Sequence, residues 1–194
     1  MSKQDRINTL FEEYKKEFQG EEIVLDCGNI DSRIILIGEA PGKDEVKLSK
    51  PFVGAAGKNL NKFLDVIGLE RESIFVANSI KYRLSKVNPK SGRIVNRPPT
   101  KEEIEKNQRY ILKEIEIISP EIIVTLGNVP LKMVTGDKGI NIGSVHGELK
   151  KIQILDKEYS IYPLYHPASI IYNASLQDVY MEDITKLKGI LKNK

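Results

Sequence analysis

Hydrophobic and polar positions divide the chain into short apolar runs and longer amphipathic segments. Apolar runs of strand length occur at 34–37, 74–80, 122–126 and 159–165, and an alternating stretch at 149–155 predicts an edge strand. Helical spacing of apolar residues occurs in 3–18, 56–67, 104–118 and 177–191. Alternating strands and helices predict an α/β fold: one three-layer αβα domain over residues 1–194, with a central, mainly parallel four-stranded sheet.

Two local signals refine this map. Asn88-Pro89, Ser91-Gly92 and Pro98-Pro99 predict an irregular loop between residues 84 and 99. Thr100, followed three residues later by Glu103, predicts a capping box at the start of the next helix.

The run Ile34–Ile37 ends abruptly in a Gly-Glu-Ala-Pro-Gly turn. Gly38 and Gly42 allow the backbone to approach a ligand, and Pro41 restricts the turn that presents Glu39. A P-loop is excluded, because three residues separate these glycines instead of four, and Asp44 follows Lys43 where Ser or Thr is required. The dinucleotide fingerprint is also absent from this turn.

Three predicted loops follow the carboxyl ends of strands and are therefore expected at one edge of the sheet. They bring together Glu39, Glu45, Phe52, Asn78 and His166. This set offers carboxylates, an aromatic face, a side-chain amide and an imidazole. Such groups fit a flat heterocycle with polar edges, although each residue type also has common structural uses at strand ends.

Composition is typical of an ordinary globular domain: 40% of the 194 residues are hydrophobic, 29% are charged, and the net charge is +3. No apolar run approaches the length of a membrane span and no signal peptide is visible, so we expect a cytoplasmic monomer without membrane contact. One cysteine, Cys27, and two histidines, His146 and His166, exclude an internal disulfide and argue against a zinc site or an iron–sulfur cluster. We therefore expect no metal and no cofactor.

Positive charge is concentrated between Glu72 and Glu102, where the sequence has no acidic residue. The basic residues there are Lys81, Arg83, Lys86, Lys90, Arg93, Arg97 and Lys101. This pattern suits contact with a phosphate backbone, and it is equally compatible with a solvated surface loop.

Several motifs, in this order and spacing, resemble the uracil-DNA glycosylase superfamily. They are Gly38-Glu39-Ala40-Pro41-Gly42, Glu45, Pro51-Phe52-Val53-Gly54-x-Ala56-Gly57, Asn78, and His166-Pro167. The pattern is most like family 4, the thermostable bacterial and archaeal type, and spans roughly residues 34 to 190. The resemblance implies a monofunctional DNA glycosylase of base excision repair that hydrolyses the N-glycosidic bond of uracil in DNA, with other deaminated bases as an open extension.

The resemblance also implies roles for individual residues. Phe52 would stack on the extruded base beside Gly38, Asn78 would bind the polar edge of uracil, and His166 would hydrogen-bond uracil O2. Glu39, or in second place Glu45, would orient the attacking water. The DNA contacts would come from the basic residues Lys86, Lys90 and Arg93, and from Ala168, Ile170 and Ile171 as a wedge after His166.

The chain departs from the family 4 pattern at its cysteines. That pattern includes four cysteines that bind an iron–sulfur cluster, whereas this chain has Tyr82 and Asn107 at two of those places. Ala168 and Tyr172 also replace the usual Ser and Arg after His166-Pro167, and His146-Gly147 stands where Arg-Gly is common. Two other functions therefore stay open: a relative that binds nucleic acid or a free base without cleavage, and a hydrolase of small nucleosides.

Overall fold

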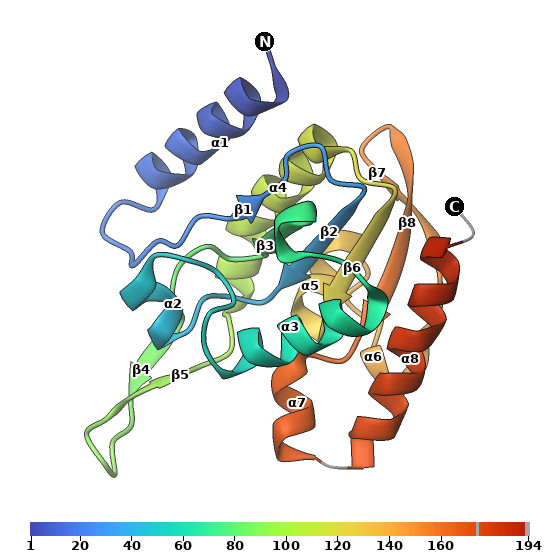
Figure 1. Ribbon diagram of the computed structural model, residues 1–194. Helices are drawn as coiled ribbons and strands as arrows, with labels where there is room; N and C mark the ends of the chain where they lie inside the picture. The colour runs from blue at the N-terminus through green and yellow to red at the C-terminus, as the bar shows by residue number, and fades with distance from the viewer. Residues whose placement is uncertain (174, 193–194) are drawn as a thin grey trace.

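A six-stranded sheet forms the centre of the protein, in the order β1-β3-β2-β6-β8-β7 (Figure 1). The computed structural model describes residues 1–173 and 175–192, and for residues 55, 56 and 170–172 it describes the backbone only. The strands of this sheet are β1 (Cys27–Gly28), β2 (Ile34–Gly38), β3 (Phe75–Asn78), β6 (Ile122–Leu126), β7 (Lys150–Ile154) and β8 (Lys157–Leu164). The four central strands are parallel, as predicted, and the edge strands β1 and β7 pair antiparallel to them.

Helices cover both faces of the sheet, which confirms the αβα architecture. The helices are α1 (Lys3–Glu17), α2 (Lys43–Leu48), α3 (Ala55–Ile67), the 3-10 turn η1 (Arg71–Ser73), α4 (Lys101–Ile118), α5 (Asn128–Thr135), α6 (Ile142–Val145), α7 (Pro167–Tyr172) and α8 (Ser175–Lys192). Side chains alternate along the strands, so Ile35 and Ile37 of β2 pack with α1, α4 and α5. Ile34 and Leu36 pack on the other face with α3 and α8. Burial on both faces explains why β2 is an unbroken apolar run.

The prediction of an irregular loop between residues 84 and 99 was wrong. Strands β4 (Ser85–Val87) and β5 (Ile94–Asn96) form a separate antiparallel hairpin that stands out from the body (Figure 1). Asn88 and Gly92 close its turn, because the Gly92 N–H donates to the Asn88 carbonyl at 2.8 Å. The sequence did not predict these strands because each has only three residues. Neither strand packs on the core, so neither shows the alternation of apolar and polar residues that indicates a strand.

Helix boundaries follow from local signals in the sequence. The capping box at Thr100 and Glu103 is present and starts α4, and a second one at Ser2 and Asp5 starts α1. None of the helices in the described part of the chain combines the length and apolarity that a bilayer span requires.

Candidate functional site

The site begins with the parallel pairing of β2 and β3, which sets Gly38 directly beside Asn78. Asn78 is 2% exposed, and its side-chain Nδ2 has no hydrogen-bond partner among the described residues. An unsatisfied buried donor costs free energy and usually marks a place for a ligand or water. This amide faces a cavity of about 330 Å³ whose lining includes Asn78, Glu45, Phe52, Asn96, His166 and Ala168.

Gly38 is required where it stands, because the site leaves no room for a side chain there. A Cβ atom at Gly38 would lie 2.4 Å from Cζ of Phe52 and 2.8 Å from Oδ1 of Asn78. The missing side chain therefore allows the Phe52 ring and the Asn78 amide to approach the end of β2.

Phe52 is held at the cavity by its own backbone and by Arg71. Its φ of 52° lies in the left-handed region, where residues other than glycine are strained. The Arg71 guanidinium donates to the carbonyls of Pro51 and Phe52 at 2.5 and 3.0 Å, which stabilises this turn. The Phe52 ring lies 6.4 Å from the ring of His166 at an interplanar angle of 27°, so two nearly parallel rings border the site.

The two carboxylates of the turn have different surroundings. Glu45 accepts hydrogen bonds from the backbone N–H groups of Gly42, Val53 and Gly54, at 3.1, 3.0 and 2.8 Å. It therefore ties the turn after β2 to the loop that carries Phe52. The Glu39 carboxylate forms no hydrogen bond or ion pair with the part of the chain that the structure describes, and burial raises its pKa above the ordinary value.

Glu39 lines a second cavity of about 200 Å³, which adjoins the first. The two cavities share Ala40, Pro41, Asn96 and His166. Glu39 and His166 thus line the same cavity, which adjoins the one that Asn78 faces. A carboxylate that is partly desolvated and not engaged by its neighbours is poised to act on a bound water or ligand.

His166 follows β8 and forms the N-cap of α7. Its Nδ1 accepts a hydrogen bond from the backbone N–H of Ala168 at 3.1 Å. Burial lowers the pKa of His166 to about 4, although the negative charge of Glu45 acts in the opposite direction. The ring is therefore neutral at physiological pH, and its one proton resides on Nε2, because Nδ1 is already an acceptor.

Sequence reasoning missed a buried charge cluster behind Asn78. The Lys81 side chain is fully buried, and its Nζ donates to Asp26 at 2.5 Å, to Glu114 at 2.8 Å and to the carbonyl of Asn78 at 3.0 Å. Burial by itself lowers the pKa of Lys81, but the two carboxylates outweigh it and the pKa is raised. Burial and the nearby Asp26 raise the pKa of Glu114 well above its usual value. Lys81 directly follows an apolar strand run, which is the signal that could have indicated its burial.

The basic residues between 81 and 101 do not form one surface. Lys81 is buried, and Arg97 forms a bidentate pair with Glu103 at 2.6 and 2.8 Å that lowers the pKa of Glu103 to about 2. Lys86, Lys90 and Arg93 are exposed on the β4–β5 hairpin. These last three residues keep the surface position that contact with a phosphate backbone requires.

The remaining candidates lie around α7 and α6. Ala168 is partly buried at the first turn of α7 and lines the larger cavity. Ile170 and Ile171 belong to the same helix, but their side chains lie outside what the structure describes. His146 Nδ1 contacts Oδ2 of the buried Asp183 at 2.7 Å, and His146 is not among the described residues that line either cavity of the site.

The places where the resemblance expects cluster cysteines hold a network of phenols and an amide. Asn107 Nδ2 donates to the hydroxyl of Tyr82 at 3.4 Å, and the hydroxyl of Tyr14 donates to Oδ1 of Asn107. Phe18 packs against Tyr14 and Tyr82 with ring centroids 4.5 and 5.2 Å away. These residues do not fit an iron–sulfur cluster, which is held by thiolates.

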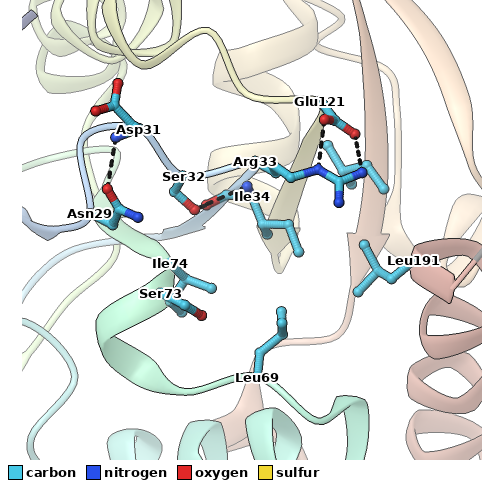
Figure 2. A pocket seen from close by; sticks show the side chains of 11 residues that line it. Asn29, Asp31, Ser32, Arg33, Ile34, Leu69, Ser73, Ile74, Glu121 and Leu191 are labelled. Atoms are coloured by element: carbon cyan, nitrogen blue, oxygen red, sulfur yellow. Dashed lines mark hydrogen bonds and ion pairs between the residues drawn. The ribbon is translucent and has the colours of Figure 1, made fainter. Parts of the chain in front are cut away.

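A separate cavity of about 300 Å³ lies at the other end of the parallel strands, where β2 and β6 begin (Figure 2). Its floor is apolar, with Ile34 and Leu191 among its residues, and polar groups at its rim bind one another. Arg33 donates to both carboxylate oxygens of Glu121, at 2.6 and 2.7 Å, as the dashed lines in Figure 2 mark. We therefore place the candidate site at the carboxyl edge, where Asn78 and Glu39 offer polar groups that the described residues leave open.

Comparison with known proteins identifies the family of this chain. The family model "Uracil DNA glycosylase superfamily" matches residues 25–187. The type-4 uracil-DNA glycosylase of Sulfurisphaera tokodaii is 38% identical over 163 residues, which cover 82% of this chain and 70% of that protein. The type-4 enzyme of Thermotoga maritima is 36% identical over 172 residues, 88% of this chain and 83% of that protein.

A relative of another kind is a DNA polymerase of Bacillus phage SP01. It is 30% identical over 189 residues, which cover 97% of this chain but 18% of the polymerase. The match to the family model over most of the chain, together with the type-4 relatives, settles the family. This chain belongs to the uracil-DNA glycosylase superfamily.

Proposed function

We propose that the chain is a monofunctional uracil-DNA glycosylase that hydrolyses the N-glycosidic bond of uracil in DNA and starts base excision repair. The observation that carries this proposal is the buried Asn78 amide, whose Nδ2 finds no partner among the described residues at the wall of a cavity bordered by Phe52 and His166. The type-4 relatives bear the same activity in their names.

Asn78 selects the base by its pattern of donor and acceptor. Uracil presents the N3–H donor beside the O4 acceptor, and a side-chain amide pairs with both, through Oδ1 and Nδ2. Cytosine presents the reverse pattern, which the amide does not match in the orientation that pairs with uracil. The open donor on Nδ2 is thus the group that O4 of uracil would satisfy.

Phe52 and Gly38 provide the surface that receives the ring. The base would stack on the Phe52 side chain, whose approach depends on the absence of a Cβ atom at Gly38. The strained Phe52 backbone, fixed by Arg71, keeps this surface in place before the base arrives.

His166 acts as a neutral donor. As the bond between C1′ and N1 breaks, negative charge accumulates on the uracil ring, and Nε2–H of His166 would donate to O2, where part of that charge resides. The interaction strengthens toward the transition state and so accelerates the reaction. The low pKa of His166 supports this role, because the neutral ring keeps the proton that it donates.

Glu39 orients the water and stabilises the positive sugar. Water supplies a hydroxyl group to C1′, and the departing uracil retains the bonding electron pair and later gains a proton at N1. The partly desolvated Glu39 carboxylate supports this assignment, whereas the three backbone hydrogen bonds of Glu45 support a positioning role for that residue.

We also propose that the chain acts as a single cytoplasmic domain and a monomer. Both core clusters rest on the one sheet, which supports a single domain. The edges of the sheet discourage pairing with a second sheet, because β1 has two residues and β7 carries Lys150 and Lys151.

The test uses a labelled oligonucleotide with one uracil opposite guanine, incubated with protein and then treated with alkali. Wild type should yield a cut strand, and Glu39→Gln should lower the rate by about 10² to 10⁴-fold. Glu45→Gln is the matched control: we expect it to affect stability and substrate affinity more than the chemical step. Binding without cleavage by the wild type would favour the non-catalytic alternative.

A further inference from the structure

The β4–β5 hairpin exposes an apolar pair among basic residues. Val87 and Ile94 are direct partners across the two strands, so their side chains share one face, and they are 63% and 61% exposed. Lys86, Lys90 and Arg93 on the same hairpin are also exposed. Lys86 points to the opposite face from Val87, because neighbouring residues of a strand alternate. Exposed apolar side chains on one face of the hairpin, with cations on the other face and at the turn, complement duplex DNA, which offers stacked bases between two phosphate backbones.

The hairpin is ordered by its own hydrogen bonds. The Asn88 N–H donates to the Arg93 carbonyl at 2.8 Å, the Lys90 N–H donates to Oδ1 of Asn88 at 2.9 Å, and Gly92 adopts a φ of 65° that favours glycine. At the base of the hairpin, Nε of Arg97 donates to the Ser85 carbonyl at 3.2 Å. The apolar pair is thus presented by a structured arm, and little conformational entropy would be lost on contact with a partner.

The arm adjoins the functional site. Asn96, the last residue of β5, lines both cavities together with His166. Ile94 is two residues away along the strand, which is about 7 Å at the rise of a β-strand. The hairpin also extends from the body on the same side as α7, which follows His166 (Figure 1). A nucleotide that enters the site would therefore leave a duplex lying against this arm.

We propose that the β4–β5 hairpin is a DNA arm: Val87 and Ile94 insert into the duplex beside the extruded nucleotide, and Lys86, Lys90 and Arg93 bind the flanking phosphates. Apolar side chains that enter a base step unstack it and bend the duplex, which helps a target base to leave the stack. The inference rests on the proposed function and adds the element that opens the duplex.

The experiment compares two substrates, a single-stranded and a double-stranded oligonucleotide, each with one uracil. The Val87→Ser/Ile94→Ser variant should lower kcat/KM on the duplex by roughly 10- to 100-fold and leave the single strand within about twofold, because only the duplex has to be opened. Leu155→Ser is the matched control, since Leu155 is 55% exposed at the β7–β8 turn, far along the chain from the arm. It should leave both rates unchanged.

A second readout separates insertion from charge. With 2-aminopurine beside the uracil, wild type should raise its fluorescence as the step unstacks, and the apolar variant should not. Changing Lys86, Lys90 and Arg93 together to alanine should flatten the salt dependence of binding, while the apolar variant keeps the wild-type slope. Val87→Ser alone serves if the double variant does not fold.

The outcomes distinguish this inference from the proposed function. A wild type that cuts neither substrate overturns the proposed function. A wild type that cuts both, with an apolar variant that matches it on the duplex, overturns the arm and leaves the glycosylase intact. An equal loss of kcat/KM on both substrates also overturns the arm, because these residues would then act on single-stranded DNA as well and not in opening the duplex.

Discussion

The backbone N–H of Asn78 donates to Oδ1 of Asp26 at 2.9 Å, which joins the residue that faces the cavity to a charge cluster behind it. The carbonyl of Asn78 accepts from Lys81 of the same cluster. Both backbone polar groups of Asn78 therefore depend on buried ionic groups, and a change in the cluster should alter the position of the amide that selects the base.

Lys81→Met tests this dependence. The substitution leaves Asp26 buried without its cation, and breaking a buried pair costs about 3 to 5 kcal/mol in the free energy of unfolding. We expect urea unfolding to show this loss, and the preference for uracil over cytosine to fall in the protein that stays folded.

A neutral cluster provides the control for that variant. Asp26→Asn, Lys81→Met and Glu114→Gln together remove all the charges, while the amide oxygen introduced at position 26 can still accept from the N–H of Asn78. This triple variant should recover much of the lost stability. A triple variant as unstable as Lys81→Met alone would show that packing, and not an uncompensated charge, causes the loss.

Asn78→Asp should relax base selection. A carboxylate accepts from N3–H of uracil but repels O4, and it accepts from the amino group of cytosine, so the two bases become more alike to the site. The ratio of kcat/KM for uracil over cytosine in matched oligonucleotides should fall by about 10- to 100-fold. An unchanged ratio would count against Asn78 as the selecting group.

His166 should titrate far below an ordinary histidine. NMR of a His146→Asn variant, which leaves one histidine, should show the ring titrating near pH 4. Because the unfolded ring gains its proton at about pH 6.5, the contribution of His166 to the free energy of unfolding should fall as pH drops from 6.5 toward 4, and it should stay level above pH 6.5. His166→Gln should remove this contribution. A ring that titrates at 6.5 would contradict the neutral donor.

Gly38→Ala should close the base pocket. The new Cβ would meet Phe52 and Asn78 at distances that force one of them to move, so binding of uracil-containing DNA should weaken by about tenfold or more. Gly189→Ala in α8 is the matched control, because no described atom lies within 4 Å of a Cβ atom there. Equal affinity in the two variants would argue against a close approach at Gly38.

Much of this arrangement could be predicted from the sequence. Parallel strands place their carboxyl ends at one edge, so the residues that follow β2, β3 and β8 had to converge, and Glu39, Asn78 and His166 do border the two adjoining cavities. The different surroundings of Glu39 and Glu45 could not be predicted, since they depend on backbone N–H groups eight and nine residues beyond Glu45.

The charge cluster and the hairpin show where sequence reasoning fails. Asp26, Lys81 and Glu114 are far apart in the chain, and a charged residue is most often at the surface, so composition alone placed Lys81 in a basic loop. The hairpin has no apolar face that packs on the body of the protein. Its Pro and Gly residues therefore predicted a loop, and its three-residue strands were too short to indicate otherwise.

The network of Tyr14, Asn107 and Tyr82 has a consequence for how the protein matures. Its hydrogen bonds join side chains of the chain itself, so this part of the fold forms when the chain folds and requires no added group. An iron–sulfur cluster held by thiolates, by contrast, depends on a supply of iron and is open to oxidation. Phenols and an amide need no metal to bond with one another, so this part of the molecule should fold without a supply of iron.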